Sequence, residues 1–327
     1  MKLLEKLEKM PGGLVIVPLI LAVAIKTLFP EFFEIGGFTT GLFKNGQPAM
    51  MGLFLILCGS SINVRQVGMP LYKGSILTGM KFILGVLLGL AVAKFFGPLG
   101  WMGLTPMVMI AAITNSNSSL YISLSAQFGK PTDTGAISIL SLNDGPFFTL
   151  VALGATGLAS IPFQALVATI IPLLIGFVWG NLDEHFKTTC QKAQPIVTFF
   201  MTISIGSSTD LSTLATAGAS GIILGLISAA SGILFYFLYN ALLKKDERSA
   251  MGAAIGTTAL NSAMTPAAIA AADPSMAHLV PMATAQCATA SIITLFLCPF
   301  LVAFFDSRMK KKRAKEAALD NHEHVHI

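Results

Sequence analysis

Charged residues are scarce in this chain of 327 residues, because Asp, Glu, Lys and Arg together make up only 11% of it. An average soluble protein has about 25% charged residues. Hydrophobic residues make up 54%, and apolar runs of about 20 residues, long enough to cross a bilayer as a helix, recur between residues 12 and 305. The shortage of charge excludes a soluble globular domain and predicts a polytopic membrane protein.

The apolar runs also lack the strict alternation of apolar and polar residues that a membrane β-barrel requires. Residues 53–58 and 82–92, for example, are apolar on every face. We therefore predict an all-α membrane protein with ten transmembrane helices. The predicted spans are 12–30, 48–64, 73–96, 103–128, 134–157, 161–181, 194–209, 217–243, 250–272 and 277–305.

Cysteine and the common catalytic motifs are sparse or missing as well. The four cysteines, Cys58, Cys190, Cys287 and Cys298, form no CxxC pair, so neither a disulfide framework nor a zinc site is predicted. The chain has no Walker A sequence for an ATP-driven pump and no potassium-channel filter. A membrane aspartyl protease needs two aspartates within spans, and only one is predicted here. We expect no enzyme and no cofactor.

The distribution of Lys and Arg indicates the orientation in the membrane. Of the 21 such residues, 17 fall on the side that holds both termini, three (Lys26, Lys44 and Lys94) fall on the other side, and Lys81 lies within a span. This predicts that both termini are cytoplasmic. It also accounts for the net charge of +5, so no nucleic-acid partner is predicted, and the sequence indicates no oligomeric state.

Short matches between the two halves of the chain suggest an internal repeat. The matching segments are 17–20 with 171–174, 59–63 with 206–210, and 111–113 with 253–255. Their order is kept, and chance similarity between small-residue segments is the alternative. Because each half holds five predicted spans, an odd number, the halves would cross the membrane in opposite senses. The predicted units are residues 1–157, residues 158–305 and a basic cytoplasmic tail at 306–327.

Polar residues interrupt the fourth and ninth predicted spans, at matching positions of the repeat. Such residues compete with the helical hydrogen bonds, so both helices are expected to be broken and to bind a ligand at the break. Helix packing through small residues is the alternative. The candidate binding residues are Asn115, Ser116, Asn117, Ser118, Ser119, Tyr121, Thr257, Thr258, Asn261 and Ser262.

Three further polar residues are candidates for ion coupling. Asp144 is the one carboxylate predicted deep in a span, where it can carry a proton or bind Na⁺. Asn143 is its neighbour, and Gln286 occupies the corresponding place in the second half. No firm metal site is predicted beyond Na⁺ at these three residues. Lys81 is a candidate partner for an anionic substrate. The alternatives are a structural ion pair with Asp144 and a side chain that extends towards the membrane interface.

The sequence resembles the bacterial 2-keto-3-deoxygluconate permeases along nearly its whole length. The resemblance rests on Lys9-Met10-Pro11-Gly12-Gly13 with Val17-Pro18-Leu19, on LNDGPFF at 142–148, on GFVWGNLD at 176–183 and on Thr265-Pro266. It implies proton-coupled import of 2-keto-3-deoxygluconate, a sugar-acid anion, across the bacterial inner membrane.

The same family is similar to the bile acid and sodium symporters. That similarity implies a panel domain made of spans one, two, six and seven, and a core domain made of the other six, in which spans four and nine cross where they unwind. Some family members carry an acid where this chain has Asn143, and another near Thr114. Sodium coupling of an organic anion therefore stays open beside proton coupling, as does a passive channel or sensor.

Overall fold

The computed structural model describes residues 3–9, 13–62, 68–207 and 211–324. The side chains of Ser119 and Asp144 lie outside the described residues, as do residues 10–12, 63 and 208–210 of the sequence matches. Within the described ranges the chain is helical and has no strand, only an isolated bridge between Trp101 and Leu104. The prediction of an all-α protein is confirmed.

The helices of the first half begin near the N-terminus and end before the Pro162 turn. They are α1 (Leu3–Lys9), α2 (Gly13–Leu28), η1 (Phe32–Glu34), α3 (Gly37–Phe43), α4 (Gln47–Ser61), α5 (Met69–Phe96), α6 (Pro106–Thr114), α7 (Ser118–Phe128), α8 (Pro131–Gly135), α9 (Ile137–Leu140), η2 (Ser141–Asp144) and α10 (Phe147–Thr156).

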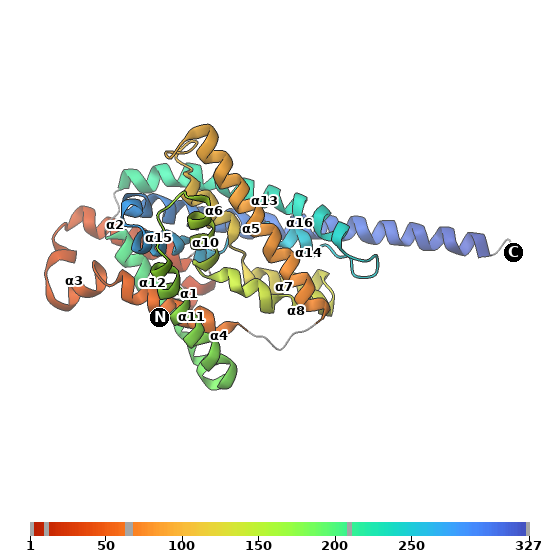
Figure 1. The fold of residues 1–327 in the computed structure, drawn as a ribbon, viewed down its shortest axis with the longest axis horizontal. Coiled ribbons are helices and arrows are strands. Elements are labelled where there is room, and N and C mark those ends of the chain that lie inside the picture. The colour runs from red at the N-terminus through yellow and green to blue at the C-terminus, as the bar shows by residue number, and fades with distance from the viewer. Residues whose placement is uncertain (1–2, 10–12, 63–67, 208–210, 325–327) are drawn as a thin grey trace.

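The helices of the second half begin at Phe163. They are α11 (Phe163–Leu182), α12 (Glu184–Gly206), α13 (Leu211–Leu242), α14 (Met251–Ala254), η3 (Leu260–Ala263), α15 (Thr265–Ala272), η4 (Pro274–Leu279) and α16 (Val280–His324). The last part of α16, which carries the basic tail, projects from the bundle as a single helix (Figure 1).

Each predicted span coincides with one helix or a series of short helices. By length and composition, four stretches of the described chain are suited to cross a membrane: Met69–Phe96, Phe163–Leu182, Ala215–Leu242 and Pro274–Lys315. A fifth is the pair Pro131–Asn143 and Phe147–Thr156, which bends by 59°. Gly13–Leu28 and Gln47–Ser61 are shorter apolar helices. The count of ten spans stays a prediction.

Glycines allow two close contacts between the halves of the chain. A Cβ at Gly59 of α4 would lie 2.1 Å from the carbonyl oxygen of Leu173 in α11, and a Cβ at Gly206 of α12 would lie 2.9 Å from the carbonyl oxygen of Leu19 in α2. Only glycine permits so close an approach of two backbones. The sequence matches pair Gly59 with Gly206 and Leu19 with Leu173.

A second pair of close contacts lies within the halves. A Cβ at Gly85 of α5 would lie 3.2 Å from the backbone nitrogen of Thr114, at the end of α6. A Cβ at Gly232 of α13 would lie 3.2 Å from the Cα of Gly256, just beyond α14. Thr114 and Gly256 directly follow the matched segments 111–113 and 253–255. Each long helix therefore approaches the broken helix of its own half at the break.

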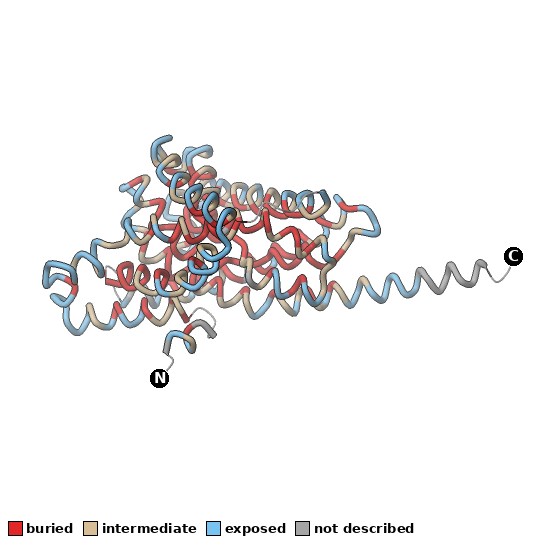
Figure 2. The backbone as a smooth tube through the Cα atoms, turned by 90° about the horizontal axis from the view of Figure 1, so that it is seen from below, coloured by how far each residue is buried: buried red, intermediate tan, exposed pale blue. Residues whose placement is uncertain are grey.

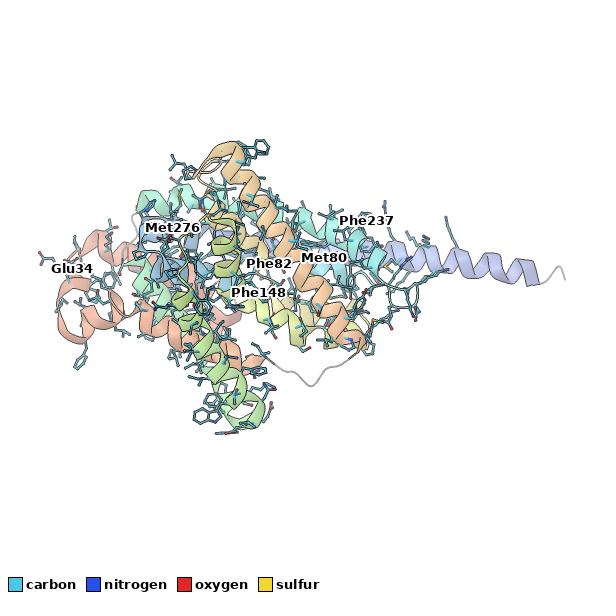
Figure 3. The ribbon with its side chains drawn as sticks, in the orientation of Figure 1. Glu34, Met80, Phe82, Phe148, Phe237 and Met276 are labelled. Carbon is cyan, nitrogen blue, oxygen red and sulfur yellow. The ribbon has the colours of Figure 1, made fainter. Side chains whose placement is uncertain are left out.

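Two packed groups of helices follow from these contacts. In one group, α4 packs against α11 and α12, and α12 packs against α2. In the other, α5 packs against α6, and α13 packs against α14 and α16. Phe82 of α5 meets Phe148 at the start of α10 edge to face, at 6.0 Å between ring centroids (Figure 3).

Buried residues run along the middle of the molecule, whereas the outward helix faces are exposed (Figure 2). Many exposed side chains are large and apolar, among them Phe237, at 60%, and Phe300, at 75%. Large contiguous apolar surfaces mark contact with another apolar phase, such as lipid. Polar side chains are buried inside the molecule, among them Lys81, Asn115 and Asn143.

Candidate functional site at two helix breaks

The first break separates α6 from α7 at residues 115–117. Asn117 caps α7, because its Oδ1 accepts from the backbone N–H of Leu120 at 2.9 Å. Asn115 turns its Nδ2 back to the carbonyl of Ala111 at 2.8 Å. Its Oδ1 and the hydroxyl of Ser116 are buried without a hydrogen-bond partner among the described residues. Buried polar atoms are nearly always paired in proteins, so these two atoms suit a ligand.

The second break lies between α14 and η3 and is held by the long helices around it. The backbone N–H of Thr258 donates to the hydroxyl of Thr294 of α16 at 3.1 Å, and the Thr258 hydroxyl donates to that of Ser228 of α13 at 3.0 Å. The hydroxyls of Ser262 and Ser291 both donate to the carbonyl of Ala259, at 2.6 and 2.7 Å. The irregular backbone is therefore satisfied by side chains, which fixes its shape.

The two breaks are in direct contact. The backbone N–H of Asn117 in the first break donates to the hydroxyl of Thr257 in the second at 3.1 Å. Lys81 of α5 reaches the same residue, because its ammonium donates to the Thr257 carbonyl. Three residues that sequence reasoning named separately are thereby brought together.

Lys81 is fully buried, with no exposed surface. No carboxylate of the described residues lies within salt-bridge distance of its Nζ. Beside it, the thiol of Cys298 in α16 donates to the carbonyl of Ala253 at 3.3 Å. The surroundings of the ammonium are thus carbonyl oxygens and neutral groups, and an ammonium in such a place attracts an anion.

The other predicted binding residues have different places. Asn261 lies in η3 with a partly exposed side chain, and Ser118 begins α7. Tyr121 is buried, but its hydroxyl donates to the carbonyl of Asp133 at 3.0 Å, so it joins α7 to α8. The side chain of Ser119 lies outside the described residues. The convergence of Asn261 with Asn115 and Asn117 on one ligand stays a prediction.

The predicted coupling residues are buried where they are described. Both amide atoms of Asn143 are buried and have no hydrogen-bond partner among the described residues. Gln286 of α16 donates through Nε2 to the carbonyl of Gly103 at 2.9 Å and to the hydroxyl of Ser220 at 2.8 Å. No group of three or more His, Cys, Asp or Glu among the described residues is arranged to hold a metal ion.

Sequence reasoning missed a buried charge cluster at the start of α5. Lys73 forms ion pairs with Asp133 of α8 and with Glu247 of the loop before α14, each at 2.9 Å. Asp133 also accepts from the hydroxyl of Tyr239 and from the backbone N–H of Lys130, both at 2.8 Å. The bond from Lys73 holds the pKa of Glu247 below its ordinary value. The partners are far apart in the sequence, so no local pattern announces them.

The comparison with known proteins now decides the family. A family profile described as 2-keto-3-deoxygluconate permease matches residues 4–311. This chain belongs to the 2-keto-3-deoxygluconate permease family. Members of this family are transporters rather than enzymes. With its long apolar helices, the chain is therefore a multi-pass membrane protein.

Individual permeases of the family match over nearly their full length. The 2-keto-3-deoxygluconate permease 1 of Salmonella typhimurium is 41% identical over 320 residues, which cover 98% of this chain and 99% of that protein. The 2-keto-3-deoxygluconate permease of Bacillus subtilis is 33% identical over 324 residues, which cover 96% and 97%. That of Escherichia coli O7:K1 is 30% identical over 322 residues, which cover 96% and 98%.

Proposed function

We propose that this protein imports 2-keto-3-deoxygluconate together with protons across the bacterial inner membrane, by alternating access. The observation that carries the proposal is the meeting of two broken helices at Asn117 and Thr257, beside the buried ammonium of Lys81. Broken helices at the middle of the membrane are where many secondary transporters bind substrate. The family and the names of its relatives support the substrate.

Ten spans in two inverted repeats are the architecture that we propose for this transport. The equivalent contacts of Gly59 with Leu173 and of Gly206 with Leu19 support the repeat. So does the equivalence of the contacts at Gly85 and Gly232. The occurrence of the same helix contacts twice supports a repeat over a chance match of short segments. The halves are residues 1–157 and 158–305, followed by the tail at 306–327.

Alternating access requires two bodies that move relative to each other. We assign α2, α4, α11 and α12 to a panel domain and the remaining spans to a core domain. The close packing of α4 on α11 and of α12 on α2 supports the panel as one body, because each contact joins the two halves. The Lys and Arg distribution supports cytoplasmic termini.

The site chemistry suits a hydroxylated anion. Asn115 Oδ1 can accept from a substrate hydroxyl, and the Ser116 hydroxyl can donate or accept. The positive charge for the carboxylate comes from Lys81 and from the N-terminus of α7, whose partial charge favours anions. Asn117, Ser118, Ser119, Thr257, Thr258, Asn261 and Ser262 are the further candidates around the breaks. Asp144 and Lys81 are the two residues that we consider as carriers of the proton.

Sodium coupling is the second candidate, and the buried amide of Asn143 favours it. Its oxygen has no described partner, and amide and carboxylate oxygens are ligands for hard cations. Asn143, Asp144 and Gln286 would then form the ion site. No cofactor takes part in either case.

Transport by purified protein in liposomes tests the proposal. Labelled 2-keto-3-deoxygluconate should exchange in counterflow, and it should accumulate when the lumen is more alkaline than the outside, with no sodium present. Accumulation that requires a sodium gradient would establish the second candidate. Equilibration without accumulation under either gradient would identify a channel, and the absence of any flux would overturn the transport function itself.

A further inference from the structure

The amino group of Lys81 lies at a helix break, where free backbone carbonyls can bind a cation. In transporters with discontinuous helices, the unwound carbonyls coordinate the coupling ion. Here the carbonyl of Thr257, in the break after α14, accepts from the Lys81 ammonium. The break therefore already holds the amino group of Lys81, which is tethered to α5 and is positive when it is protonated.

The neighbours of Lys81 leave this charge without compensation among the described residues. Of the helices that pack on α5, α6, α9 and α10 contain no titratable residue. Asp133 of α8 and Tyr239 of α13 are bonded to each other near Lys73, eight residues and about 12 Å along the helix from Lys81. Cys298 of α16 is engaged with Ala253.

Two further titratable residues, Tyr236 and Asp144, lie on the surrounding elements and the segments between them. Tyr236 of α13 stacks on Phe305 at 3.9 Å between ring centroids. Asp144 ends η2, between α9 and α10, and its side chain lies outside the described residues. One turn before Lys81 on the same face of α5, Thr78 has a buried hydroxyl without a described partner.

We propose that Lys81 carries the co-transported proton and thereby takes the place of an inorganic coupling cation. The inference rests on the proposed function. A buried ammonium without an anion is costly, and the cost is relieved when an anion arrives beside it. The substrate carboxylate supplies that anion. Binding of substrate and protonation of Lys81 therefore favour each other, which is the definition of coupling.

The transport cycle then balances in charge and in atoms. On the outside, the neutral amine of Lys81 forms an N–H bond with a proton from water, and the sugar-acid anion binds. The loaded site is neutral and crosses. On the inside the anion leaves, the N–H bond breaks, the proton passes to water and the electron pair returns to Nζ. The empty carrier returns neutral, so one proton moves with each anion.

Thr257 connects the two events structurally. Its carbonyl binds Lys81, and its hydroxyl accepts from the Asn117 backbone at the first break. A change in the charge of Lys81 therefore alters its bond to the Thr257 carbonyl. Through Thr257 it also affects the position of the Asn117 backbone, which faces the proposed substrate site. No sodium ion is needed in this scheme.

The test compares Lys81→Gln and Lys81→Arg with the wild type in liposomes, and uses Lys94→Gln as the matched control. Lys94 is exposed near the end of the same helix. The wild type should accumulate substrate about tenfold per pH unit, as one proton per anion requires. Membrane potential alone, set with potassium and valinomycin, should drive no accumulation. Lys94→Gln should match the wild type both under a pH gradient and under membrane potential alone.

Arginine keeps its charge at all pH values used, so Lys81→Arg should exchange substrate in counterflow but lose accumulation. Lys81→Gln should exchange at a rate that no longer falls as the pH is raised on both sides. Accumulation by either variant at the wild-type level would overturn the proposal. So would loss of accumulation in Asp144→Asn while Lys81→Gln retains it.

If neither Lys81 variant folds, measurements on the wild type can still contradict the proposal. Accumulation driven by membrane potential, or by a sodium gradient without a pH gradient, would overturn the proposal while leaving the transport function intact. A wild type that exchanges no 2-keto-3-deoxygluconate would instead overturn the proposed function, and the role of Lys81 would fall with it.

Discussion

The backbone N–H of Asn117 donates to the hydroxyl of Thr257 across 3.1 Å, although 140 residues separate them in the chain. This bond joins the breaks of two helices from different halves of the protein. Because Thr257 also binds Lys81 through its carbonyl, the geometry of both breaks and the position of the ammonium depend on one threonine.

Thr257→Val keeps the shape of the side chain and removes the hydroxyl. The Asn117 N–H then loses its partner, so we expect substrate affinity to weaken by about 1 kcal/mol. The measurement is the Kd for 2-keto-3-deoxygluconate by calorimetry in detergent. Thr169→Val is the matched control, because the Thr169 hydroxyl bonds only to the carbonyl of Ala165 in its own helix. Equal affinities in wild type and Thr257→Val would contradict the assignment.

Asn115→Ala removes the buried Oδ1 that has no described partner. If this oxygen accepts from a substrate hydroxyl, binding should weaken by about 1–3 kcal/mol with little loss of protein stability. Asn117→Ser separates binding from capping, because serine also caps a helix. Asn261→Ala should weaken binding in the same way if η3 faces the ligand. Unchanged Kd values in Asn115→Ala and Asn261→Ala would remove both residues from the site.

Asp144→Asn distinguishes two roles of the acid. With Lys81 as proton carrier, the variant should still accumulate substrate under a pH gradient. If Asp144 carries the proton instead, accumulation should vanish while exchange persists. If Asp144 only balances Lys81, both activities and the melting temperature should fall, since an unpaired buried charge remains. Recovery of the melting temperature by adding Lys81→Met would establish that structural pair.

Gly59→Ala tests the close contact between α4 and α11. The new Cβ would lie 2.1 Å from the Leu173 carbonyl oxygen, so the helices must separate, at a destabilisation of about 1–3 kcal/mol. Gly206→Ala should have a comparable effect at the equivalent contact. Gly52→Ala, on the same helix as Gly59, introduces a Cβ with no atom within 4 Å. The melting temperature in detergent measures the stability of all three variants. If Gly52→Ala lowers it as much as Gly59→Ala does, the close contact with α11 is not the cause of the destabilisation.

The charge cluster at Lys73 predicts a pH dependence of stability. The pKa of Glu247 is lowered from its ordinary value of 4.5 by the bond from Lys73. A lowered carboxylate pKa stabilises the fold above the unfolded value, and this stabilisation is lost as the pH falls below 4.5 through the folded pKa. Melting temperatures from pH 7 to pH 3.5 should show a smaller acid loss in Glu247→Gln than in the wild type.

At neutral pH, the buried ion pairs of Lys73 can be compared with an exposed ion pair of the same protein. Lys73→Met leaves the buried Asp133 carboxylate without its cation, which should destabilise the protein by about 3–5 kcal/mol. Lys187→Met removes the ion pair with Glu184, whose carboxylate is 75% exposed, and should change stability by at most about 1 kcal/mol. Similar melting temperatures for the two variants would show that the Lys73 cluster contributes no more than a surface pair.

Local properties of the sequence were sufficient for the class of protein, the places of its helices and the two breaks. Apolar runs, prolines and polar residues act on the backbone within a few residues of themselves, so the polar segments at 114–119 and 256–265 mark the ends of α6 and α14 without any knowledge of the fold. The internal repeat stays a prediction from short, contiguous sequence matches.

Contacts between distant segments needed the tertiary structure. Lys81 was assigned either to a substrate or to Asp144, and its described partner is the carbonyl of Thr257, 176 residues away. The burial of Asp133 beside Lys73 and the approach of Gly59 to Leu173 likewise depend on helices from different parts of the chain. A buried charge selects its partner by distance in space and by desolvation, and neither quantity is encoded in any local pattern of residues.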